Sequence, residues 1–96
     1  MTSETTESFR IAATHPALPG HFPGHPIVPG VVLLDRVAAA LEKDGARLAR
    51  ISVVKFLAPL KPAEDATLAI VRDGARVTFR IDRDGTPILR GEGELA

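Results

Sequence analysis

Residues 31–45 read VVLLDRVAAALEKDG, and this stretch decides the fold. It is rich in Leu and Ala, which favour a helix. Pro29 and Gly30 precede it, as is common where a helix begins, and Gly45 stands where a helix typically ends. The stretch therefore predicts one helix of about 13 to 15 residues, roughly 20 Å long.

The predicted helix carries few charges. Between Gly30 and Leu41 only Asp35 and Arg36 are charged. A helix that is apolar on almost every side must be enclosed, so we expect it to lie in the core. A carboxylate in such a place is costly unless it is hydrogen-bonded or paired. Asp35 therefore either faces solvent at the helix edge, pairs with a nearby arginine, or has a chemical role.

The residues after the helix change to a period of two, which is typical of strands. Turn signals at 61–65, Asp73-Gly74 and Asp84-Gly85 divide them into four successive strands, and the two Asp-Gly steps are the strongest hairpin signals. A further strand is expected at Ser8–Thr14. We predict an α+β architecture in which a curved antiparallel sheet of about five strands wraps the helix. The four later runs are ARLARISVVKFLAPL (46–60), ATLAIVRDG (66–74), ARVTFRIDRDG (75–85) and TPILRGEGEL (86–95).

Length and composition limit the classes of protein. The 96 residues suit one domain, which we place at residues 8–96 after a polar, disordered terminus at residues 1–7. Equal numbers of basic and acidic residues, twelve each, argue against nucleic acid as a partner. The absence of cysteine excludes disulfides and cysteine nucleophiles, and the first residues lack the features of a secretory signal, which favours the cytoplasm. The longest nearly uncharged stretch, residues 15–34, contains five prolines, so we expect no membrane span.

All three histidines, His15, His21 and His25, fall in one proline-rich segment, HPALPGHFPGHPIVPG at residues 15–30. Two histidines four residues apart converge on a metal when they lie on a helix, and the prolines between them exclude a helix. We therefore expect no metal site. Since no other segment gathers side chains able to titrate near neutral pH, this segment is the main candidate for chemistry.

Residues 21–35, HFPGHPIVPGVVLLD, resemble the active-site segment of the FabA/FabZ family of 3-hydroxyacyl-acyl-carrier-protein dehydratases. Both Pro-Gly steps of the family pattern are present, and so is the interval of 14 residues from His21 to Asp35. A second block, VKFLAPLKP at residues 54–62, is similar to a second stretch of the family. The resemblance covers roughly residues 9–95 and implies the hot-dog fold, in which an antiparallel sheet wraps a long central helix, usually in a dimer.

The chemistry that the resemblance implies has three requirements. Loss of water from a 3-hydroxyacyl thioester needs a base for the C2 proton, a donor for the thioester carbonyl and an acid for the departing hydroxyl. Imidazole suits the first task near neutral pH, so we assign His21 as the base. Gly30 stands at the helix start, where backbone N–H groups are free to donate. Asp35 would orient or protonate the hydroxyl, and by the resemblance it comes from the other subunit.

The resemblance also implies the surroundings of the reaction. No cofactor is expected, and the expected partners are an acyl carrier protein bearing a 3-hydroxyacyl chain and a second copy of the chain, with higher oligomers possible. We expect Phe56 in the core and Lys55 on the solvent-exposed face of its strand, although both could instead line a channel for the acyl chain. The residues expected to contact substrate are Phe22, Pro29, Gly30 and Val31. A basic rim for an acidic carrier could be formed by Arg36, Arg47, Arg50, Lys55 and Lys61.

The chain departs from the family pattern at Ala39, where a Gln is common. Asp as the helix acid resembles the FabA branch, whereas Pro23 and the prolines around it resemble the FabZ branch or the short dehydratases of aryl polyene synthesis. The branch, the acyl chain length, the choice between carrier protein and coenzyme A, and any isomerase activity all stay open.

Two other functions compete with dehydration. One is an acyl-thioester hydrolase on the same fold, although hydrolysis has no need of a histidine aimed at C2. The other is a non-catalytic protein that binds acyl carriers, for which Ala39 is the chief support. Retention of both His21 and Asp35 argues against a decayed site.

Overall fold

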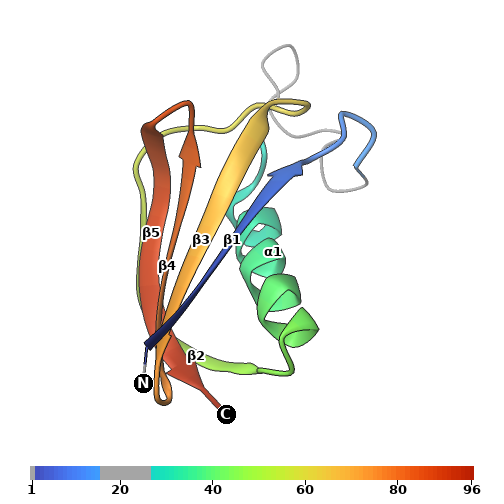
Figure 1. Cartoon of the computed structure of the whole chain (residues 1–96). Coiled ribbons are helices and arrows are strands. Elements are labelled where there is room, and N and C mark those ends of the chain that lie inside the picture. Colours follow the sequence, from blue (N-terminus) through green and yellow to red (C-terminus); the bar gives the residue numbers. More distant parts are fainter. Residues whose placement is uncertain (1, 16–26) are drawn as a thin grey trace.

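The computed structural model describes residues 2–15 and 27–96. These residues form one helix and a five-stranded antiparallel sheet with the order β1-β3-β4-β5-β2, which curves around the helix (Figure 1). The predicted α+β architecture is confirmed. The elements are β1 (Thr2–Arg10), α1 (Gly30–Lys43), β2 (Leu48–Phe56), β3 (Asp65–Asp73), β4 (Arg76–Arg83) and β5 (Thr86–Leu95).

The bounds of α1 agree with those predicted. The helix begins at Gly30, directly after Pro29, and ends at Lys43, before Gly45 adopts a positive φ of 76°. Glycine is favoured there because L side chains rarely adopt that conformation. Within the described residues no helix has the length and apolar character that crossing a membrane requires.

Only one face of α1 is buried, so the expectation that the helix is enclosed on every side is wrong for the single chain. Val31, Asp35 and Ala39 are exposed on the other face. The physical reason is that one curved sheet covers a helix from one side only, and a second surface is needed to cover the rest. The buried helix residues are Val32, Leu33, Val37, Ala40 and Leu41.

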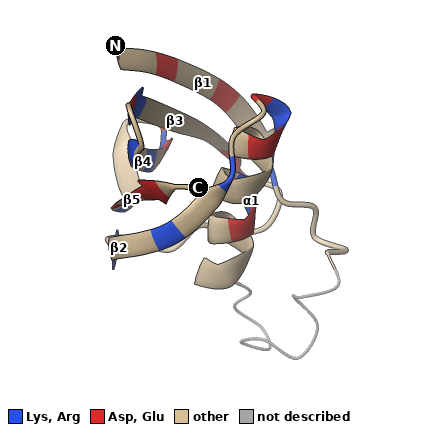
Figure 2. Cartoon of the chain, turned by 90° about the horizontal axis from the view of Figure 1, so that it is seen from below, with Lys and Arg blue, Asp and Glu red and all other residues tan. Residues whose placement is uncertain are grey.

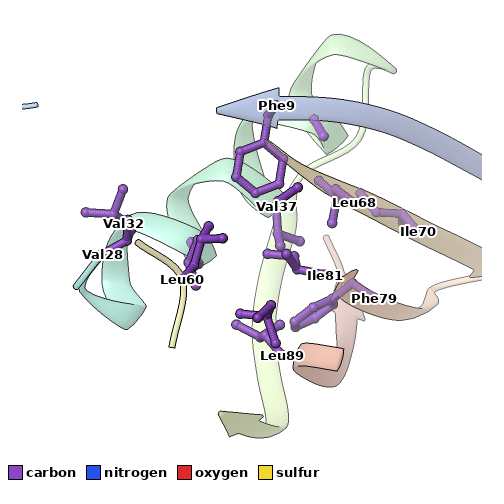
Figure 3. Close-up of a cluster of buried hydrophobic side chains, with 14 of the residues drawn as sticks. Phe9, Val28, Val32, Val37, Leu60, Leu68, Ile70, Phe79, Ile81 and Leu89 are labelled. Carbon is purple, nitrogen blue, oxygen red and sulfur yellow. The ribbon is translucent and has the colours of Figure 1, made fainter. Parts of the chain in front are cut away.

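The core lies between the inner face of the sheet and the buried face of α1 (Figure 3). On β4 the predicted alternation holds, since Val77, Phe79 and Ile81 are buried and the residues between them are exposed. Such alternation leaves one sheet face packed and the other in water. The core residues labelled in Figure 3 are Phe9, Val28, Val32, Val37, Leu60, Leu68, Ile70, Phe79, Ile81 and Leu89.

Both Asp-Gly steps make tight hairpins. Asp84 and Gly85 have φ values of 47° and 79° and connect paired residues of β4 and β5, as a two-residue type I′ turn requires. The other turn is shifted by one residue from the prediction, because Asp73 still pairs with Arg76 and Gly74, with φ of 61°, takes the first turn position. Glycine at that position suits a two-residue turn of type II′.

The first strand begins at Thr2, so the prediction of a disordered terminus at residues 1–7 and of a first strand at Ser8–Thr14 is wrong for the described residues. β1 pairs with β3 along its whole length, from Thr2 opposite Asp73 to Arg10 opposite Asp65. Its alternation is invisible in the sequence, because most of its inward-facing residues are polar.

Polar contacts to α1 explain why this strand tolerates such residues. Glu7 lies 3.8 Å from both Arg36 and Lys43, and Thr5 donates a hydrogen bond of 3.2 Å to Asp44. Figure 2 shows acidic residues on β1 and both signs of charge at the far end of α1. Threonine also favours extended backbone, so β1 forms once β3 offers it a partner.

Candidate functional site

The start of α1 has backbone N–H groups that lack an acceptor among the described residues. Pro29 caps the helix without a side-chain hydrogen bond, and the Val32 N–H donates to the Pro29 carbonyl at 3.0 Å. The N–H groups of Gly30 and Val31 find no acceptor within the described residues. Such groups carry the positive end of the helix dipole and can donate to an external oxygen.

An apolar hollow of about 550 Å³ opens at this helix start. Both segments that carry the family resemblance line this hollow, and the Val28 N–H joins them by donating a hydrogen bond of 2.8 Å to the Leu60 carbonyl. Ligand sites of this kind are mostly apolar with a few placed polar groups. The lining residues are Ile27, Val28, Pro29, Gly30, Leu33, Phe56, Leu57, Ala58, Pro59 and Leu60.

Gly30 is the residue over which the Phe56 ring lies. A Cβ placed on Gly30 would come within 2.6 Å of two ring atoms of Phe56, closer than side chains tolerate. The absence of a side chain therefore lets the ring approach the first turn of the helix. Phe56 is 54% exposed, so the expectation that it lies in the core is wrong. Its strand, β2, is at the sheet edge, where the described residues leave the ring half open.

Asp35 lies one turn further along α1, on the exposed face, and is absent from the lining of the hollow. It forms no hydrogen bond or ion pair with any described residue, so the interpretation that it pairs with an arginine is wrong. The side chain of its neighbour Arg36 is directed toward β1, where its guanidinium lies 5.3 Å from the centre of the Phe9 ring and 3.8 Å from Glu7. Asp35 is exposed in the single chain, in agreement with the interpretation that it faces solvent at the helix edge.

The structure brings together part of the predicted substrate-contacting set. Pro29 and Gly30 line the hollow, whereas Val31 is 63% exposed on the outer helix face. His21 and Phe22 lie outside the described residues, so their roles stay predictions. Among the described residues no group of three potential metal-binding side chains is found. Phe56 is the site residue that sequence reasoning placed wrongly, although its position in the second family block was a signal.

The predicted basic rim is not a single free surface. Arg36 is held between Phe9 and Glu7, and Arg50 forms an ion pair of 2.8 Å with Glu94. Lys55 stands on β2 beside Phe56, on the opposite face of the strand, because neighbouring strand residues point to opposite faces.

Comparison with known proteins places this geometry in a family. The family model described as ApeI-like, ApeI dehydratase, matches residues 2–92. The 3-hydroxyacyl-[acyl-carrier-protein] dehydratase FabZ of Syntrophomonas wolfei is 46% identical over 89 residues, which cover 88% of this chain and 60% of that protein. The chain thus spans less than two thirds of that relative's length.

Solved structures agree on the fold. The dehydratase heterocomplex ApeI:P from Xenorhabdus doucetiae matches with a TM-score of 0.86 and 28% identity, over all of this chain and 94% of that one. The fluoroacetyl-CoA thioesterase FlK matches with a TM-score of 0.65, but at 16% identity it supports the fold alone. The hot-dog fold expected from the sequence is confirmed, and the chain belongs to the ApeI-like dehydratase family, within the FabA/FabZ-like hot-dog dehydratases.

Proposed function

We propose that this protein removes water from a (3R)-3-hydroxyacyl thioester, carried by an acyl carrier protein, to form the trans-2-enoyl thioester. The observation that carries the proposal is the pair of N–H groups at Gly30 and Val31 that have no acceptor among the described residues, at the helix start where Gly30 lines an apolar hollow between the two family segments. A thioester carbonyl accepting from these groups is stabilised as negative charge develops on its oxygen. The hollow then offers apolar surface to the acyl chain.

In the proposed mechanism His21 takes the C2 proton, and the electron pair moves toward the thioester carbonyl, which accepts a hydrogen bond from the Gly30 N–H. The C3–O bond then breaks, and Asp35 protonates the departing hydroxyl so that water leaves. Phe22, Pro29 and Val31 contact the substrate around these groups. The reaction is a redox-neutral elimination and calls for no cofactor.

We further propose that the working unit is a homodimer with composite sites. β2 is an edge strand, and unpaired edges invite another strand. Three large apolar residues are exposed at the end of β2, in the segment after it and at the adjoining end of α1: Val31 at 63%, Phe56 at 54% and Leu57 at 51%. A second copy seated there would cover this surface and the outer face of α1, which carries Asp35.

The test is incubation with crotonyl thioesters of an acyl carrier protein and of coenzyme A, with product analysis. Appearance of the 3-hydroxyacyl thioester, by reversal of the proposed reaction, supports a dehydratase. Release of free thiol together with crotonate would show that the protein is a thioesterase and not a dehydratase. No turnover on either thioester would favour a non-catalytic protein that binds acyl carriers.

Asp35→Asn is expected to lower kcat for dehydration by about 100-fold, because the amide cannot protonate the hydroxyl. Stability should not fall, since the Asp35 carboxylate has no partner among the described residues to lose. Steady-state kinetics and thermal unfolding check the two halves of this prediction. A large fall in melting temperature with activity preserved would make Asp35 a structural residue.

Gly30→Ala is expected to lower kcat/KM by about 10- to 100-fold, since the methyl group pushes the Phe56 ring into the hollow and crowds the carbonyl site. The half-exposed ring can swing aside, so the melting temperature should change little. Gly45→Ala is the matched control: its Cβ would meet nothing within 4 Å, but φ of 76° is strained for alanine. It should lose about 1 kcal/mol of stability and no activity. Full activity in Gly30→Ala would contradict the proposed carbonyl site.

A further inference from the structure

Three cations stand in one row across the sheet. Arg80 of β4 is opposite Arg90 of β5, and Arg90 is opposite Lys55 of β2. Residues directly opposite each other in antiparallel strands share a face. All three are exposed, whereas their chain neighbours Phe79, Ile81 and Leu89 belong to the core. The row therefore lies on the outer face of the sheet, opposite the side that packs on α1.

This row differs from three other cations on the strands of the sheet. Arg10, Arg50 and Arg76 each form an ion pair of 2.8 or 2.9 Å with a carboxylate on a neighbouring strand.

In the row itself the charges are left largely unbalanced. In the part of the chain that the structure describes, Arg80 forms an ion pair only with Asp82, two residues along its own strand, at 3.4 Å. Arg90 and Lys55 form no ion pair with any described residue. Like charges directly opposite each other destabilise a sheet, so the row works against folding rather than for it.

We infer that this row is a docking surface for an acidic helix of a partner protein. Neighbouring strands lie about 4.8 Å apart, so the three cations spread over roughly 10 Å. Carboxylates one turn apart on a helix repeat about every 5.4 Å, and three of them span about 11 Å. A helix lying across the strands can thus place one carboxylate beside each cation.

Acidic residues border the row and favour this occupant over a broad anionic surface. Asp82 lies on one side and Glu92 on the other, each two residues along its strand from a cation, or about 7 Å. A lipid surface or a nucleic acid backbone would meet these carboxylates as well as the cations. A helix with a single stripe of acidic residues can instead contact the three cations without contacting the bordering carboxylates.

Apolar side chains beside the row fit the rest of such a helix. A hollow of about 250 Å³ next to Arg80 and Arg90 is lined by Val71 and the buried Ala69, and also by Glu4, a further acidic residue at the border of the row. Val53 is 42% exposed next to Lys55 on the same strand. A helix with leucines next to its acidic stripe would bury these apolar groups. The surface involves none of the residues assigned to dehydration, so the inference stands independently of the proposed function.

Fluorescence anisotropy tests the inference with a labelled helical peptide of about five turns, carrying Glu in one stripe and Leu beside it. Arg90→Gln/Lys55→Gln should bind this probe about tenfold more weakly than the unmodified protein, since two exposed charge contacts are lost. Arg10→Gln/Arg50→Gln changes the net charge equally but removes cations that already have partners. This control should bind within about twofold of the unmodified protein.

Three results would overturn the inference. Equal weakening in both double variants would mean that only net charge matters. Binding to phosphatidylserine vesicles or single-stranded DNA as tight as to the peptide, and lost in Arg90→Gln/Lys55→Gln, would identify a broad anionic partner instead. A lower melting temperature in that variant would make the row a structural feature, because relief of repulsion should leave stability unchanged or slightly higher.

Discussion

His21→Ala is expected to lower kcat/KM for dehydration by about 10² to 10⁴-fold and to leave the fold intact. The loss is large because alanine cannot accept the C2 proton, and the N–H groups at the start of α1 stabilise charge only after that proton moves. The fold should survive because the described core between the sheet and α1 is built from apolar side chains of other residues. Steady-state kinetics with a 3-hydroxyacyl carrier protein, together with thermal unfolding, measures both quantities.

His25→Ala is the matched control for this prediction. It removes an imidazole from the same segment, at a position to which we assign no role in the reaction, and should keep activity close to that of the unmodified protein. Turnover unchanged in His21→Ala would remove His21 from the role of base. Loss of folding in that variant would assign His21 a structural role instead.

Mixing inactive His21→Ala chains with inactive Asp35→Asn chains is expected to restore about a quarter of the active sites. Random association makes about half of the dimers mixed, and each mixed dimer contains one site with both original groups and one with neither. Recovery requires that Asp35 act in the partner's site, which its place on the exposed face of α1 allows. Activity measured against mixing ratio, after subunit exchange is verified by mass spectrometry, checks the prediction.

Two results would contradict the composite site. No recovery after complete exchange would place His21 and Asp35 in the site of one chain. A monomer at micromolar concentration by light scattering would remove the partner altogether. In that case the exposed apolar residues on and after β2 and at the start of α1 would need another explanation.

The sequence predicted the elements whose signals are local. The Leu- and Ala-rich run between Pro29 and Gly45 set the bounds of α1, since helix starts and stops depend on residues a few positions apart. Val77, Phe79 and Ile81 marked the inner face of β4, because strand alternation is also read from neighbours. Asp84-Gly85 marked its hairpin, since positive φ values are a property of single residues.

What the tertiary structure alone decided depends on contacts between distant residues. β1 is a strand because β3 pairs with it and Glu7 meets Arg36, although its own residues give little hydrophobic signal. The Phe56 ring lies over Gly30 because β2 carries it there from 26 positions along the chain.

The same division holds for the charges and for the candidate site. The residues of 21–35 indicated, through their resemblance to the FabA/FabZ family, which groups could act on a thioester, since that resemblance depends on residue type and order. Arg80, Arg90 and Lys55 become one row only through the register of three strands. A local sequence pattern indicates which face of its own helix or strand a residue occupies. The register between strands and the burial of each helix face are decided only when elements distant in the sequence pack together.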